Sequence, residues 1–276
     1  MRGLVFVVAL TLALGTLGSS LRFAGADSGQ ATYIMADGSV NPSNAPIQRN
    51  GNLFTLVGNI HITLYDDGIV IERNNTVLEG ADHVLIGPNI AESDFTAGVR
   101  IMGGIRNVTI RNLEIEEFAY GVWLNWSRDS AVYGNNLTND RFGIHMESSL
   151  HNLITGNNIY GNRIAGFELL WSYDNNITLN NICDGVSLPG TLHNNWDDGV
   201  SRGNYWSSYN GSDMNHDGVG DQPYIIDPNN VDHYPLMIQQ TIIPEFQSAL
   251  IPFIFMATTL LMASLFKKTK RDRVSR

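Results

Sequence analysis

The most distinct chemical pattern in the sequence is a run of oxygen-bearing side chains at residues 213–221. Side-chain oxygens fall at positions 1, 3, 5 and 9 of the run, a glycine stands at position 6, and position 7 offers its backbone carbonyl. This spacing wraps alternating ligands around one hard cation, so it predicts a calcium site. The predicted metal ligands are Asp213, Asn215, Asp217, Val219 and Asp221.

The run departs from the calcium pattern at position 12, where Tyr224 replaces the usual bidentate glutamate. Asp227 is a candidate substitute for that ligand. Fewer charges predict a weaker affinity, which suits a site outside the cell. The alternative is a turn rich in Asn, Asp and Gly that binds no ion. In either case we expect the loop to stiffen the chain rather than to catalyse a reaction.

A second group of candidate residues recurs at intervals of 23, 22 and 23 residues. A tryptophan ring can stack on a sugar, and charged side chains can bind hydroxyl groups or exchange protons. The predicted ligand-binding residues are Arg100, Trp123, Asn125, His145 and Glu168. The candidates for acid–base catalysis are Glu147, Glu168 and His145, since retaining glycosidases need two carboxyl groups about 5–5.5 Å apart. The alternative is an ordinary solvated face. Trp126 and Trp171, which follow nearby, favour the binding interpretation.

The element that positions these residues is an internal repeat. Four glycines that open apolar runs, Gly98, Gly121, Gly143 and Gly166, are spaced by 23, 22 and 23 residues. A second series, Asn112, Asn136, Asn158 and Asn181, is spaced by 24, 22 and 23 residues. Two markers with one period indicate a repeat architecture.

Within each repeat, apolar and polar residues alternate with the period of a β-strand. We expect the column Val108, Val132, Ile154 and Ile177 to face inward, together with Val122, Ile144 and Phe167. Short strands broken by Asn and Gly corners predict a parallel β-helix, an all-β solenoid whose coils stack about 4.8 Å apart. The asparagine series is then predicted to pair its side-chain amides up the stack.

The repeats also carry a family resemblance. The segments VTIRNLEI, NLITGNNI and NITLNNI resemble the right-handed β-helix repeats of the carbohydrate-binding and sugar-hydrolase class, which includes the NosD-like copper-maturation proteins. The resemblance covers roughly residues 31–237. The segments ADGSV and IVIER resemble an archaeal version of this class, and NNWDDG, GNYWSSY and YPLM resemble its C-terminal cap. We expect Trp196, Tyr205, Trp206 and Tyr209 to seal the last coil rather than to stack on sugars.

Composition limits the class of partner. The net charge of −10 argues against a nucleic-acid backbone as ligand. The single cysteine, Cys183, excludes an internal disulfide framework. We interpret it as a shielded thiol rather than a nucleophile.

The ends of the chain predict export and anchoring. Residues 248–266 carry no charge and are long enough to span a bilayer, and the basic residues that follow place the C-terminus inside. Pro244-Glu245-Phe246 resembles the PEF motif of archaeal sorting tails. The predicted organisation is a signal peptide (1–26), a lead-in and cap (27–58), coils (59–184), a C-terminal cap (185–237), a linker (238–247), a transmembrane helix (248–266) and a basic tail (267–276). An uncleaved N-terminal anchor is the alternative to the signal peptide.

The sequence therefore predicts an exported, membrane-anchored surface protein. Its expected role is non-enzymatic: a module that binds glycans or neighbouring surface proteins, or a structural one. The alternative is a carbohydrate-active enzyme that uses the outward face. A third possibility, copper maturation, follows only from the NosD resemblance, because the seven histidines form no short-spaced cluster.

Overall fold

The computed structural model describes residues 26–27, 29–89 and 95–241. The predicted transmembrane helix, the basic tail and all but the last residue of the predicted signal peptide lie outside these ranges. The described ranges consist of strands, turns and irregular segments, with no helix of the length and apolar character needed to cross a bilayer.

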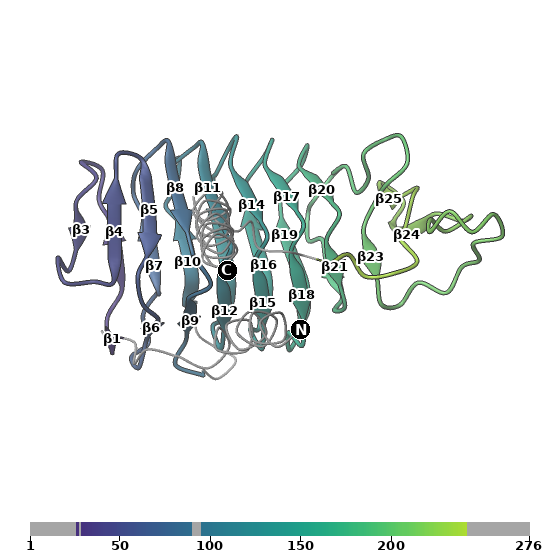
Figure 1. Cartoon of the computed structure of the whole chain (residues 1–276). Helices are drawn as coiled ribbons and strands as arrows, with labels where there is room; N and C mark the ends of the chain where they lie inside the picture. Colours follow the sequence, from purple (N-terminus) through teal and green to yellow (C-terminus); the bar gives the residue numbers. More distant parts are fainter. Residues whose placement is uncertain (1–25, 28, 90–94, 242–276) are drawn as a thin grey trace, which may run out of the picture. The chain divides into compact units, whose positions relative to one another are not determined.

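The predicted all-β parallel solenoid is confirmed. Each coil contributes one short strand to each of three sheets, and the strands stack side by side (Figure 1). Sheet 1 consists of β1 (Ala26–Asp27), β6 (Ile60–His61), β9 (Val84–Ile86), β12 (Glu114–Glu116), β15 (Asn136–Thr138), β18 (Asn158–Tyr160), β21 (Asn181–Ile182) and β23 (Tyr205–Trp206). Sheet 2 consists of β2 (Thr32–Ile34), β3 (Val40–Asn41), β7 (Ile69–Ile71), β10 (Ala97–Ile101), β13 (Tyr120–Asn125), β16 (Phe142–Glu147), β19 (Ala165–Leu170) and β22 (Val186–Ser187).

Sheet 3 and a separate hairpin complete the described part of the chain. Sheet 3 consists of β4 (Ile47–Asn50), β5 (Leu53–Leu56), β8 (Thr76–Glu79), β11 (Val108–Arg111), β14 (Ala131–Tyr133), β17 (Leu153–Thr155) and β20 (Asn176–Thr178). The hairpin is formed by β24 (Tyr224–Asp227) and β25 (Asn230–Asp232). Pairing in the three sheets is parallel, except where β3 and β4 join antiparallel at the N-terminal end. Parallel pairing already includes β1, β2 and β5, so the stack extends into the expected lead-in segment.

Strand register confirms the glycine series and corrects the other one. Val99, Val122, Ile144 and Phe167 pair in sequence along sheet 2, so the preceding glycines share one column. In sheet 3, however, Val132 pairs with Ile110, not with Val108. In sheet 1, Asn136 pairs with Glu114, not with Asn112. The first interval of the asparagine series was therefore two residues too long. The cause is that Asn112 binds Glu79 of the preceding coil instead of entering the amide column.

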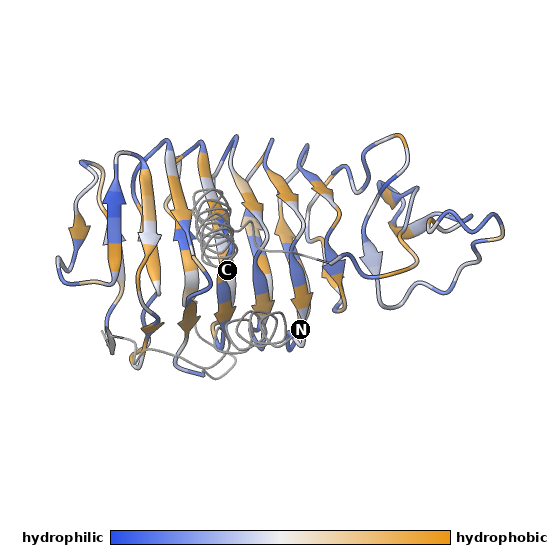
Figure 2. Ribbon diagram, in the orientation of Figure 1, coloured by the Kyte–Doolittle hydropathy of each residue, from blue (hydrophilic) through white to orange (hydrophobic). Residues whose placement is uncertain are grey.

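The core fills the interior of the coils. Val122, Ile144, Phe167, Val132 and Ile154 are fully buried, as the alternation predicts. Figure 2 shows polar and apolar residues alternating along the strands. At the C-terminal end, Trp196 and Trp206 are buried against the last coil and Tyr224 stacks on Trp206, with ring centroids 4.3 Å apart. The prediction that the cap aromatics seal the stack is confirmed for these two tryptophans.

Buried asparagine ladders hold the corners between sheets. The backbone N–H and the side-chain amide of Asn135 both donate to Oδ1 of Asn157, at 3.0 and 2.9 Å. Asn157 repeats these bonds with Asn180, and Asn180 with Asn204. Each amide also donates to a backbone carbonyl of the preceding coil, as Asn157 does to Val132 at 2.9 Å. The corners, which lack regular strand pairing, are satisfied in this way.

The outer asparagine series also pairs, but over three residues rather than four. Asn158 donates to Asn136 at 2.8 Å and Asn181 donates to Asn158 at 2.5 Å. A further buried ladder starts at Ser130 and continues through Asn152 and Asn175. The sequence prediction placed the amide ladder on the outer asparagine of each pair, whereas the continuous buried ladder uses the inner one.

One carboxylate occupies a place that suits an amide. Asp140 is fully buried in a ladder with Asn162: its N–H donates to Asn162 Oδ1 at 3.1 Å, and its own Oδ1 accepts the N–H of Phe118 at 2.8 Å. Its second oxygen is buried without a partner. Burial raises the pKa of Asp140 well above its ordinary value. Asn162 uses the equivalent position to donate from Nδ2 to the carbonyl of Leu137 at 3.1 Å.

We expect Asp140→Asn to stabilise the protein at neutral pH. A raised folded-state pKa means that stability is lost as the pH rises above the unfolded value of about 4, and the amide cannot ionise. The melting temperature at pH 7 should rise by about 3 °C, and the gain should shrink towards pH 4. The control is Asp129→Asn, at an exposed corner, which should change neither value. A lower melting temperature for Asp140→Asn at pH 7 would contradict this assignment.

Candidate functional site

The predicted ligand-binding residues form one column on the outward face of sheet 2. The register pairs Arg100 with Trp123, Trp123 with His145, and His145 with Glu168, on strands β10, β13, β16 and β19. Asn125 pairs with Glu147 two residues further along the same strands. The structure therefore brings together every residue that the sequence placed on this face. Parallel neighbours fix their separations at about 4.8 Å per coil.

Arg100 is held in place from two sides. Its Nε and Nη2 atoms contact the two carboxylate oxygens of Asp67 at 2.6 and 2.8 Å, which is the bidentate arrangement. Its guanidinium lies 3.8 Å from the ring centroid of Trp123, a cation–π contact. Both side chains of the ion pair are mostly buried. The sequence analysis missed Asp67, whose only signal is its place beside the glycine that opens the β7 run.

His145 is buried although it points away from the core. It is 4% exposed, and its Nδ1 lies 2.8 Å from Oε2 of Glu168. The N–H is not aligned as a regular hydrogen bond, so the contact is a close polar pair rather than a directed bond. The ring of Tyr120 covers His145 at 4.4 Å between centroids, and Trp123 meets it edge-on at 5.1 Å. His145 is thus fixed by its neighbours on three coils.

An aromatic cluster lies under the edge of this column. Tyr120 stacks on Phe142 at 5.8 Å between centroids and on Trp123 at 4.9 Å. Burial, and secondly the charge of Glu168, raise the pKa of Tyr120. The indole Nε1 of Trp123 is buried and has no hydrogen-bond partner. It is one of few polar atoms on this face without one, and a partner would improve its energy.

The three candidates for acid–base catalysis do not form a facing carboxylate pair. Glu147 pairs in register with Leu170, and Glu168 pairs with His145, so the two glutamates are offset by two residues on adjacent coils. Glu168 is engaged with His145. The arrangement supplies one carboxylate–imidazole pair and one separate, half-exposed carboxylate.

A cavity of about 220 Å³ adjoins the Arg100 end of the column. Its lining combines an ion pair with two aromatic side chains: Tyr65, Asp66, Asp67, Phe95, Thr96 and Arg100. The column thus continues into a hollow at the edge of the same face.

The predicted calcium loop turns back on itself. Asp213 accepts the backbone N–H groups of Asp217 and Gly218, at 3.2 and 3.0 Å. Asp221 accepts from Ser212 and from the N–H of Met214, at 3.0 and 2.9 Å. Throughout residues 26–27, 29–89 and 95–241, no three or more His, Cys, Asp or Glu side chains are grouped to hold a metal ion. Calcium binding by Asp213, Asn215, Asp217, Val219 and Asp221 stays a prediction.

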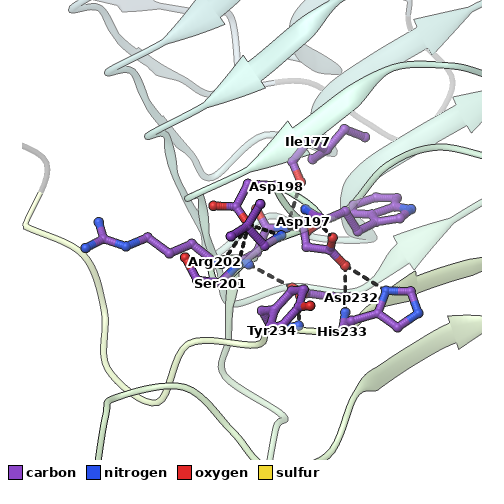
Figure 3. A network of polar contacts seen from close by, with 12 residues as sticks. Ile177, Asp197, Asp198, Ser201, Arg202, Asp232, His233 and Tyr234 are labelled. Carbon is purple, nitrogen blue, oxygen red and sulfur yellow. Dashed lines mark hydrogen bonds and ion pairs between the residues drawn. The ribbon is translucent and has the colours of Figure 1, made fainter.

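The hairpin β24–β25 closes the asparagine ladders. The N–H of Asn204 donates to Asp232 Oδ2 at 2.7 Å, and the N–H of Asn194 donates to Asn230 Oδ1 at 3.0 Å. The indole N–H of Trp206 also donates to Asp232, at 2.8 Å. Figure 3 shows Asp232 beside Asp197, which binds His233 at 2.8 Å. Burial raises the pKa of Asp232 from 3.8 to about 6, against the lowering effect of its three N–H donors.

The comparison with protein families decides the relationship. The family model described as "Periplasmic copper-binding protein (NosD)" matches residues 18–211. The chain belongs to the NosD family. The "Probable ABC transporter binding protein NosD" of Pseudomonas aeruginosa PAO1 is 31% identical over 147 residues, which cover 46% of this chain and 33% of that protein. The chain therefore spans about a third of the length of this NosD relative.

The described residues do not supply an evident copper ligand set for a NosD-family metal site. Copper sites in proteins combine several His, Cys or Met side chains. His145 is the histidine most enclosed by this face, but its Nδ1 faces Glu168 and Tyr120 and Trp123 surround it. Cys183 contacts Gln239 at 3.7 Å. No copper ligand is assigned here, and the outward column remains the candidate site of this NosD-family chain.

The raised pKa of Asp232 predicts a visible titration. The indole proton of Trp206 should change its chemical shift with a midpoint near pH 6, because it donates to the titrating carboxylate. The carboxylate costs the folded state about 3 kcal/mol at most, and this stability is lost as the pH rises from about 4 to about 6. NMR of labelled tryptophan tests this. The same titration in Asp232→Asn would show that another group causes it.

Calcium should raise the melting temperature if residues 213–221 form a site. We expect a rise of a few degrees at millimolar calcium, because the cation binds only the folded loop, and no rise with Asp217→Ala. The exposed Asp129→Ala is the matched control for loss of one charge. An equal calcium effect in Asp217→Ala and wild type would place the cation elsewhere.

Proposed function

We propose that the chain is an exported, right-handed β-helix module that binds a glycan without catalysis, through the outward face of sheet 2. One observation carries the proposal. Four coils in succession present Arg100, Trp123, His145 and Glu168 in one column, joined by direct contacts. Export is supported by the NosD family description, which calls its members periplasmic.

The physical properties of this face suit a neutral, hydroxyl-rich ligand. Parallel strands hold the column rigidly, so little entropy is lost when a ligand binds. The half-exposed Asn125 and Glu147 can accept or donate hydrogen bonds to hydroxyl groups. The net charge of −10 disfavours polyanions. We further propose that residues 248–266 anchor the module at the cell surface, where a neighbouring surface protein would be the other class of ligand.

A carbohydrate-active enzyme is the rival within the same face. Its residues would be Glu147, Glu168 and His145. The offset of the two glutamates and the engagement of Glu168 by His145 favour binding over hydrolysis, because no second carboxylate directly faces the first.

The family match favours a second candidate function, a role in copper maturation. The described side chains provide no copper ligand set, so we derive no step that involves the metal. Copper is included in the test below for this reason.

The test is a screen of the full chain against a polysaccharide panel, scored for retention and for released product. We expect retention without product, and we expect Trp123→Ala to weaken retention at least about tenfold, since one well-packed aromatic contact is worth about that factor. Tyr160→Ala, an exposed aromatic on sheet 1, is the matched control and should bind normally.

Three outcomes would change the assignment. Product release that Glu168→Ala abolishes would make the chain an enzyme. Stoichiometric copper binding without any glycan retention would favour the copper-maturation role. Retention that both Trp123→Ala and Glu168→Ala leave intact would remove the outward column from the site.

A further inference from the structure

Two exposed tryptophans occupy equivalent corners two coils apart. Trp126 follows β13 and Trp171 follows β19, and they are 61% and 58% exposed. The backbone N–H of Trp126 donates to Glu147 on the next coil, and the N–H of Trp171 donates to Pro189. Ser148 holds the same corner on the coil between them and donates to Leu170. The two indoles therefore belong to one column that runs along the axis of the stack.

The backbone at these corners is unfavourable for tryptophan. Trp126 and Trp171 have φ values of 51° and 50°, in the left-handed region. Most other non-glycine residues in that region of this protein are Asn or Asp, which tolerate it. A bulky residue there is an outlier, and such strain persists mainly where it serves a function. Neither corner needs an indole for folding, because Ser148 makes the same turn.

The indoles are directed along the surface rather than into it. A β-carbon at Gly190, the next corner after Trp171, would collide with the indole nitrogen of Trp171. The indole therefore lies over the following coil. Ser148 leaves the corresponding space beside Trp126. Small residues alternate with tryptophans along the column, which leaves two flat aromatic surfaces separated by two coil spacings, or about 10 Å.

The geometry points to a binding platform for an extended, neutral β-linked polysaccharide that lies parallel to the stack axis. In such a chain every second sugar presents the same face, and two sugar units span roughly the separation of the two indoles. Each indole would stack on one sugar ring. Asn125 and Glu147, half-exposed on the strands beside this column, face the ligand with an amide and a carboxylate for its hydroxyl groups.

This inference rests on the proposed glycan-binding function and adds the ligand's linkage, direction and contact residues. It places the stacking surfaces at the corner, whereas Trp123 lies within the buried column beside it. The net charge of −10 argues against acidic polysaccharides on this platform.

The test measures the affinity of the full chain for neutral β-linked hexasaccharides and for the matching disaccharides. The hexasaccharide should bind at least about tenfold more tightly, because only it reaches both indoles. Trp126→Asn and Trp171→Asn should each remove most of this advantage and leave disaccharide binding within about threefold. Asparagine is chosen because it keeps the left-handed corner. Gly190→Ala should weaken hexasaccharide binding by displacing Trp171, and Tyr160→Ala should have no effect.

The outcomes separate this inference from the proposed function. Equal affinity for both lengths, or normal hexasaccharide binding in Trp126→Asn and Trp171→Asn, would overturn the platform. If Trp123→Ala then still lost binding, the proposed function would stand without it. Binding only to α-linked or acidic glycans would also overturn the platform. Absence of any glycan binding would remove both.

Discussion

The hydrogen bond between side-chain amides of successive coils is the constraint on which this solenoid depends. Three sheets cannot meet around a narrow core unless the backbone turns sharply between them, and each turn removes peptide groups from strand pairing. The inner asparagines replace that pairing: Asn157 binds Asn180 above it and the carbonyl of Val132 below it. Each such bond contributes about 1 kcal/mol net, whereas an unsatisfied buried group costs more. The corners therefore require asparagine more strictly than the strands require any one apolar residue.

The functional surface follows from the same constraint. Because the corners are fixed, each outward residue of sheet 2 stands directly beside its equivalents on the adjacent coils. That is how Arg100, Trp123, His145 and Glu168, which are far apart in the chain, become one column. The contacts within the column, from the Arg100–Trp123 stack to the His145–Glu168 pair, then order side chains that would otherwise be free. A rigid scaffold and a pre-ordered face together reduce the entropic cost of holding a ligand.

The sequence predicts the repeat, the fold class and the outward column, because all three depend on spacing alone. It does not predict the register of the first coil correctly. Asn112 resembles the later asparagines in sequence, but Glu79 on the preceding coil binds its amide, and no local pattern reveals that contact. Asp67 was missed for a similar reason, since it joins the site through Arg100 across 33 residues. The role of β25 as the end of two ladders was also hidden, because Asn230 and Asp232 lie outside the repeat.

The ladders have a direction, and this has a consequence for how such proteins vary in length. Every inner asparagine offers an acceptor to the coil before it and takes one from the coil after it, so each coil presents the same pair of ends. A unit of 22 or 23 residues can therefore be duplicated or lost by recombination while both ends of the stack still find their partners. Insertions of any other length would break the column. Gene duplication in this lineage is thus constrained to whole coils, and the reach of the outward face becomes a property that selection can adjust in discrete steps.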